Sequence, residues 1–126
     1  YDPGGMSRAE REVGALAASM VNHCIYCAAV HADRHAKLEN STKLTDSLFA
    51  KGAKADLSLR DRAIFDFAQG LSAAPSKASK ENVKALRAAG LQEVEILDLI
   101  LSTALFGWAN RLMHVLGDPV RQEDES

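Results

Sequence analysis

The segment Val21–His35 reads V-N-H-C-I-Y-C-A-A-V-H-A-D-R-H and holds both cysteines of the 126-residue chain. On an α-helix, Cys24, Cys27 and His31 stand at positions i, i+3 and i+7 and therefore share one face. An imidazole beside a thiol, or a helix N-terminus, lowers the pKa of the thiol and favours the reactive thiolate. The pattern therefore predicts a dithiol with a neighbouring base.

Three other interpretations of this segment stay open. The cysteines could simply be small buried hydrophobes. A zinc site could add His31 and His35 to the two cysteines, but on one straight helix the outer ligands would lie ~16 Å apart. Because zinc holds its ligands within about 2.3 Å, such a site needs a chain break or further ligands. A thioredoxin-type motif expects a preceding strand, and this chain has helical patterns on both sides of the dithiol.

A helix is predicted on the N-terminal side of the segment. Ser7 followed by Glu10 is the capping-box pattern that opens helices. Apolar residues then recur at the spacing of one helix face, namely Val13, Leu16, Ala17, Met20 and Val21. A second helix is predicted over Cys24–Leu38, followed by a polar break at Asn40–Thr42.

Further helices are predicted downstream. They are Leu44–Lys51 ended by Gly52, a helix capped by Ser58 and ended before Pro75, a short helix from Ser79 to Gly90, and a last helix over Gln92–Leu116 closed by Gly117. Arg121–Ser126 is expected to be a frayed tail. No stretch shows the period-2 alternation of a strand, and no internal repeat is present. We therefore expect one all-α domain over residues 1–126, with about six helices.

The last predicted helix is apolar nearly all round, through Ile96, Leu97, Leu99, Ile100, Leu101, Leu105, Phe106 and Trp108. Such a helix is either central to the core or partly buried against another subunit, so a homo-oligomer is expected. Its uncharged stretch Leu99–Ala109 has 11 residues. A membrane span requires ~20, so no span is expected.

Composition and charge point to an ordinary globular protein. Hydrophobic residues make up 47% and charged residues 25% of the chain, and the formal net charge is −2. This charge provides no electrostatic footprint for nucleic acid or an anionic membrane. No signal peptide is visible in Tyr1–Glu10, so the closely spaced cysteines suggest redox chemistry in a reducing cytosol. The chain begins with Tyr1 rather than Met, as expected of a fragment or a trimmed form.

The run from Ser7 to Leu38 resembles the carboxymuconolactone decarboxylase-like superfamily. The residues that carry the resemblance are Arg11-Glu12, Asn22, Cys24-Ile25-Tyr26-Cys27 and His31. Within the superfamily, the chain is most similar to the alkyl hydroperoxidase D-like, peroxidase-related branch. Leu86–Leu91, Asn110–Leu112 and Leu116-Gly117 are also similar to that branch. The resemblance covers nearly the whole chain and implies an AhpD-like helical fold with a CxxC helical hairpin.

The resemblance also implies roles for individual residues. Cys27 matches the peroxidatic cysteine, Cys24 the resolving cysteine, His31 the motif histidine and Glu12 the relay glutamate of the family. Tyr26 stands where the best-known hydroperoxidases carry a histidine. From its position alone, Glu12 reads more readily as a solvated charge at a helix start, which the helix dipole favours.

The implied function is that of a thiol-dependent, alkyl hydroperoxidase-like antioxidant enzyme, an oxidoreductase acting on peroxide. The family suggests a lipoyl or thioredoxin-like dithiol reductant and a trimer or hexamer, and it implies no metal, haem, flavin or other cofactor. Two alternatives remain: a non-catalytic redox-sensing dithiol module, and a decarboxylase of the same fold that does not need the dithiol.

The implied relay requires a break in the chain. On one straight helix, Glu12 would lie ~22 Å along the axis from Cys27, which no proton relay spans. Glu12 and His31 are equidistant from a break between Val21 and Asn22, so a helical hairpin there would bring them face to face. Asn22 suits the turn because Asn tolerates the left-handed conformation. The same break would place the cysteines in the first turn of the second helix, where the dipole favours a thiolate.

Overall fold

Six α-helices and one short 3-10 turn account for most of residues 5–117, the part of the chain that the computed structural model describes. In order they are α1 (Arg8–Val21), α2 (Ile25–Glu39), α3 (Lys43–Lys51), the 3-10 turn Gly52–Lys54, α4 (Leu59–Ser72), α5 (Lys80–Ala88) and α6 (Glu93–Leu116). No strand occurs within that range. The predicted all-α class is therefore confirmed, whereas the predicted tail Arg121–Ser126 lies outside the described residues.

The helix starts follow the capping residues of the sequence. Ser7 Oγ accepts a hydrogen bond from the backbone N–H of Glu10 at 3.2 Å, and the Glu10 carboxylate accepts one from the N–H of Ser7 at 3.4 Å. Ser58 and Ser79 cap α4 and α5 in the same way through their hydroxyl oxygens. These hydrogen bonds satisfy backbone donors that a helix start would otherwise leave without partners.

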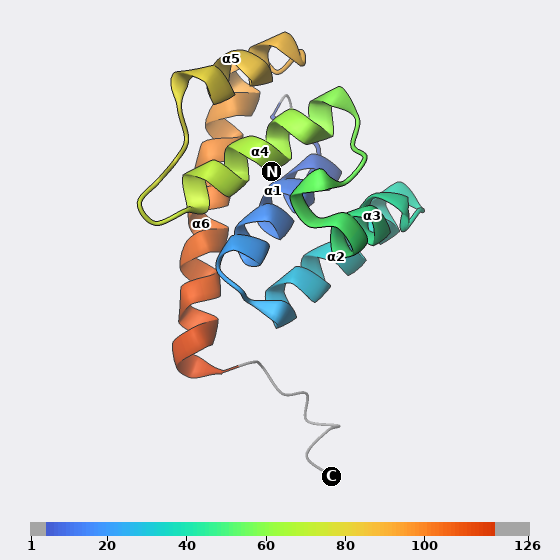
Figure 1. The fold of residues 1–126 in the computed structure, drawn as a ribbon, viewed down its shortest axis with the longest axis vertical. Helices are drawn as coiled ribbons and strands as arrows, with labels where there is room; N and C mark the ends of the chain where they lie inside the picture. Colours follow the sequence, from blue (N-terminus) through green and yellow to red (C-terminus); the bar gives the residue numbers. More distant parts are fainter. Residues whose placement is uncertain (1–4, 118–126) are drawn as a thin grey trace.

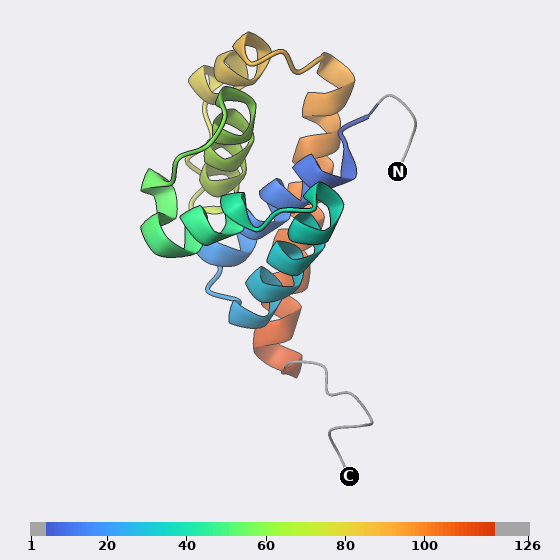
Figure 2. The same cartoon turned by 90° about the vertical axis from the view of Figure 1, so that its right-hand side faces the viewer.

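Helix α1 is the central element, and it packs against α2, α4 and α6 (Figures 1 and 2). Every residue from Arg11 to Ser19 is buried. Gly14 marks the close approach of α1 to α6, because a Cβ atom built on it would lie 3.0 Å from Leu99 Cδ1. The core around α1 is formed by Val13, Leu16, Leu48, Ile64, Phe65, Leu86 and Leu99.

Helix α6 runs along one side of the molecule (Figure 1) and buries fewer of its residues than its composition suggested. Ile96, Leu99, Thr103 and Asn110 are buried. By contrast, Val94, Leu97, Leu101, Leu105, Trp108, Val115 and Leu116 are exposed. The exposed side chains recur about every helical turn and form one apolar stripe, which is the surface expected to contact another subunit.

Helix α6 is longer than its uncharged stretch Leu99–Ala109, from which no membrane span was expected. Its 24 residues make it the one helix in the described part of the chain that is long and apolar enough to cross a membrane. Length and composition alone do not define a membrane span, because core helices of globular proteins share them. In this structure α6 packs on α1 and α4 as part of the fold.

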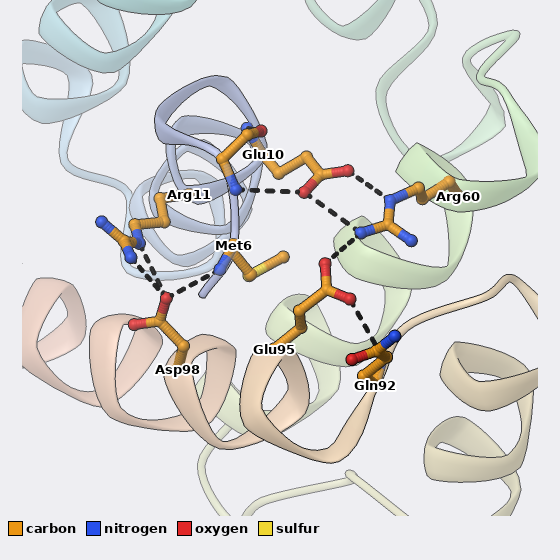
Figure 3. Close-up of polar contacts among 8 residues, drawn as sticks. Met6, Glu10, Arg11, Arg60, Gln92, Glu95 and Asp98 are labelled. Carbon is orange, nitrogen blue, oxygen red and sulfur yellow. Dashed lines mark hydrogen bonds and ion pairs between the residues drawn. The ribbon is translucent and has the colours of Figure 1, made fainter. Parts of the chain in front are cut away.

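Two ion-pair groups fasten the N-terminal half of α6 to the rest of the molecule (Figure 3). Arg60 on α4 lies between Glu10 of α1 and Glu95 of α6 and forms an ion pair with each carboxylate. The hydrogen bond to Glu10 raises the pKa of the Arg60 guanidinium above its ordinary value. Arg11, which is buried, donates from Nε to the carboxylate of Asp98 at 3.0 Å. Sequence patterns did not indicate these contacts between distant segments.

Candidate dithiol site

The chain breaks between α1 and α2, as the relay geometry predicted. Helix α1 ends at Val21 and α2 begins at Ile25, so the two form an antiparallel hairpin. The residue in the left-handed conformation is His23, with φ of 55°, and the prediction of Asn22 for that role is wrong. Asn22 keeps a φ of −82° as the C-cap of α1.

Contacts with α6 explain how Asn22 is held. Its side-chain amide donates to Asn110 Oδ1 at 3.2 Å, and its carbonyl oxygen accepts a hydrogen bond from His114 Nε2 at 2.5 Å. The turn is therefore completed by a distant helix, and the next residue takes the left-handed conformation. Histidine is among the residues that adopt positive φ more often than most non-glycine residues do.

The two cysteines lie at the start of α2 and are joined as a disulfide with a Cα–Cα separation of 5.3 Å. Cys24 is the N-cap, one residue before the helix, and its Sγ accepts a hydrogen bond from the backbone N–H of Cys27 at 3.3 Å. The predicted proximity of the cysteines and their position at the first turn are confirmed. Backbone N–H groups at a helix start favour negative charge, so this position suits a thiolate in the reduced protein.

A buried carboxylate–imidazole pair joins the two helices of the hairpin, with Glu12 on α1 and His31 on α2, the helix that carries the cysteines. Glu12 Oε2 and His31 Nδ1 are 2.6 Å apart, and the two residues are only 5% and 7% exposed. The predicted approach of Glu12 to His31 is confirmed, and the interpretation of Glu12 as a solvated charge is wrong because α2 covers it. With Nδ1 held by the carboxylate, Nε2 is the ring nitrogen left to exchange a proton. His31 lies one helical turn after Cys27, on the same face of α2.

Phe106 is a further neighbour of the site that the sequence did not single out. Its ring and that of His31 have centroids 4.8 Å apart and planes inclined by 67°, an edge-to-face arrangement. Phe106 lies on α6, and the sequence pattern of α6 predicts the same role, core or interface, for each of its apolar residues. No sequence pattern distinguishes it from its neighbours.

Two hollows in the surface of the protein are lined in part by Cys24. One hollow, of about 460 Å³, is mainly apolar and includes Met20, Ile25 and Phe49. The other, of about 200 Å³, includes Tyr26 and His114. Tyr26, expected to neighbour the cysteines, is partly exposed at this second hollow. Both hollows could admit small reactants to the edge of the disulfide.

The structure separates the alternatives for the cysteines. Both are buried, as small hydrophobes would be, yet they are bonded to each other and share the hairpin with an ion pair. His35, the fourth ligand of the zinc hypothesis, is buried one turn beyond His31, and no hydrogen bond satisfies its Nδ1. Within residues 5–117, no group of three or more His, Cys, Asp or Glu side chains is arranged to hold a metal ion. The geometry therefore favours dithiol chemistry.

The fold and the site together define a class: an all-helical domain with a CxxC dithiol at a helix start and a buried Glu–His pair behind it. The model of the carboxymuconolactone decarboxylase family matches residues 1–43, the part that contains α1 and α2. A comparison with curated proteins finds no match. The family match over residues 1–43 and the AhpD-like structural neighbours support the carboxymuconolactone decarboxylase/AhpD-like superfamily for this chain.

Solved structures of other proteins share the fold. An uncharacterised peroxidase-related protein from Silicibacter sp. TM1040 is 26% identical, with a TM-score of 0.83 over 98% of this chain and 65% of that one. One from Ralstonia eutropha JMP134, described as an alkylhydroperoxidase AhpD core, is 30% identical, with the same TM-score and the same coverage. The present chain thus spans 65% of the length of both. A protein of unknown function from Agrobacterium tumefaciens, a suggested AhpD-type antioxidant defence protein, shares the fold at 18% identity, with a TM-score of 0.78 over 93% of this chain and 82% of that one.

Proposed function

We propose that this protein is a thiol-dependent peroxidase that reduces hydroperoxides with the Cys24–Cys27 dithiol. The observation that carries the proposal is the buried Glu12–His31 pair, 2.6 Å apart, placed one helical turn from Cys27. A buried carboxylate next to an imidazole favours its protonated form, and an imidazolium next to a thiol favours the thiolate. The similarity of residues 1–43 to the carboxymuconolactone decarboxylase family and the peroxidase-related structural neighbours support the same chemistry.

In the first step, His31 takes the proton of the Cys27 thiol on Nε2, directly or through a water molecule, while Glu12 holds Nδ1–H. The Cys27 thiolate then attacks one oxygen of the hydroperoxide. The S–O bond forms as the O–O bond breaks, and the departing alkoxide takes the proton from His31 and leaves as an alcohol. Cys27 is oxidised to sulfenic acid, and the peroxide is reduced.

In the second step, the Cys24 thiol condenses with the sulfenic acid on Cys27. The S–S bond forms, the S–O bond breaks and one water molecule leaves. The 5.3 Å Cα–Cα separation lies within the range of protein disulfides, so this step requires no large movement. An external dithiol then reduces the disulfide by two thiol exchanges and becomes oxidised itself. We propose a lipoyl or thioredoxin-like donor in a reducing cytosol, and the scheme requires no cofactor or metal.

We also propose that the protein forms a homo-oligomer, a trimer or a hexamer, through the apolar stripe of α6. All seven large side chains of the stripe are more than half exposed. A second copy would remove this surface from water. Sedimentation at micromolar concentration should show an assembly of several chains, and a stable monomer would contradict this proposal.

The activity is tested by steady-state peroxide reduction with a dithiol donor. We expect multiple turnovers in the native protein and none in Cys27→Ser. Cys24→Ser should leave a sulfenic acid on Cys27 that dimedone traps and mass spectrometry locates. A trapped sulfenic acid on Cys24 in Cys27→Ser, with none on Cys27 in Cys24→Ser, would reverse the two roles.

The same assay separates the alternatives. A redox-sensing module would form the disulfide once and show no sustained turnover with any donor. A decarboxylase would consume its lactone substrate equally well in a variant that lacks both cysteines. Either result would replace the peroxidase proposal.

A further inference from the structure

The imidazole of His31 is contacted by side chains from two other helices. The hydrogen bond from Nδ1 to the Glu12 carboxylate holds one atom of the ring. Because Cβ, Cγ and Nδ1 define the plane of the ring, this hydrogen bond sets the direction of Nε2 only while it is intact, and its loss frees the broad last torsion of the side chain. A contact to the ring from another helix would limit that rotation and help to keep the hydrogen bond formed.

Phe106 provides that second contact from a different helix. Its ring meets the His31 ring at a centroid distance of 4.8 Å and an angle of 67°, within the range of edge-to-face aromatic pairs. Glu12 on α1 and Phe106 on α6 thus hold the ring at different places, while α2 carries its backbone.

We propose that Phe106 is a positioning residue for His31, which holds the plane of the imidazole so that Nε2 faces Cys27. The effect of Phe106 on peroxide reduction rests on the proposed function. The contact itself affects the reactivity of Cys27 whatever the substrate. It can therefore be tested on the thiol alone, separately from peroxidase activity.

The test compares Phe106→Leu with Phe106→Tyr, each combined with Cys24→Ser so that Cys27 is the sole thiol. Leu keeps an apolar side chain and removes the aromatic ring, whereas Tyr keeps the ring. We expect Phe106→Leu to lose the ring-current shift of the His31 ring protons in the NMR spectrum. It should also slow iodoacetamide alkylation of Cys27 at neutral pH by about 3- to 10-fold. Phe106→Tyr should retain both the shift and the rate.

The control is Leu59→Ala, which truncates an exposed residue at the start of α4, outside the apolar stripe of α6, and should alter neither measurement. Phe106→Met replaces Phe106→Leu if the latter does not fold. If a folded variant has lost the ring-current shift but Cys27 is alkylated at the wild-type rate, the proposal is wrong. Slow alkylation of Cys27 in Phe106→Tyr would also overturn it. If the native protein fails to reduce peroxide while these thiol measurements follow expectation, the proposed function falls and the positioning role stands.

Discussion

Replacing Glu12 by Gln removes the charge behind His31 and keeps the shape of the side chain. In the native protein the carboxylate lies 2.6 Å from Nδ1, and both groups are buried, so solvent screens the interaction little. The amide of Gln can still form a hydrogen bond with the ring. The variant therefore isolates the contribution of the negative charge to the imidazolium–thiolate pair with Cys27.

The magnitude follows from the contact. Two unit charges about 4 Å apart at an effective dielectric constant of about 20 attract by about 4 kcal/mol. Much of this attraction offsets the cost of burying the carboxylate. A hydrogen bond to a charged group is worth about 1.5–3 kcal/mol and a neutral one about 1 kcal/mol. A net loss of about 2 kcal/mol lowers the population of the reactive pair about 30-fold, since each tenfold change corresponds to about 1.4 kcal/mol.

The assay is stopped-flow reaction of the reduced protein with peroxide. Glu12→Gln should lower the second-order rate constant about 30-fold at pH 7. The variant lacks the charge that favours the imidazolium–thiolate pair, so the deficit should shrink in alkaline buffer, where a thiol loses its proton without help from a neighbouring group.

The matched control is Glu10→Gln, on the same helix. Glu10 pairs with Arg60 at the other side of α1, so its replacement should lower stability to urea and leave the peroxide rate unchanged. A Glu12→Gln protein that folds normally and reacts at the native rate at pH 7 would refute the reasoning and remove Glu12 from the mechanism.

Three further substitutions test the fold and the assembly. Arg60→Met leaves the carboxylates of Glu10 and Glu95 facing each other without a cation, and urea unfolding should show a loss of about 1–2 kcal/mol. Gly14→Ala places a methyl group 3.0 Å from Leu99 Cδ1 in a filled core, and thermal unfolding should show a loss of about 1–3 kcal/mol. Leu101→Glu puts a charge in the apolar stripe of α6, and sedimentation should show single chains with an unchanged far-UV spectrum.

Features that depend on a few neighbouring residues were predictable from the sequence. Ser7, Ser58 and Ser79 cap their helices as expected, because each cap joins residues three apart in the chain. The proximity of Cys24, Cys27 and His31 follows from helical spacing alone. The hairpin that brings Glu12 to His31 was inferred from the family resemblance and the length of a helix, since neither Gly nor Pro marks the break. The catalytic roles of these residues and the single domain over residues 1–126 stay predictions.

Contacts between distant segments were decided only by the tertiary structure. Packing against α6 holds Asn22 through Asn110, 88 positions away, and leaves His23 as the left-handed residue of the turn. The packing of α6 also brings Phe106 into contact with His31. Which apolar residues of α6 stay exposed depends on which of them α1 and α4 cover. The sequence of a helix determines its own hydrogen bonds and which residues share a face. Which of those residues meets a given partner depends on the crossing of whole helices, and no local pattern encodes that.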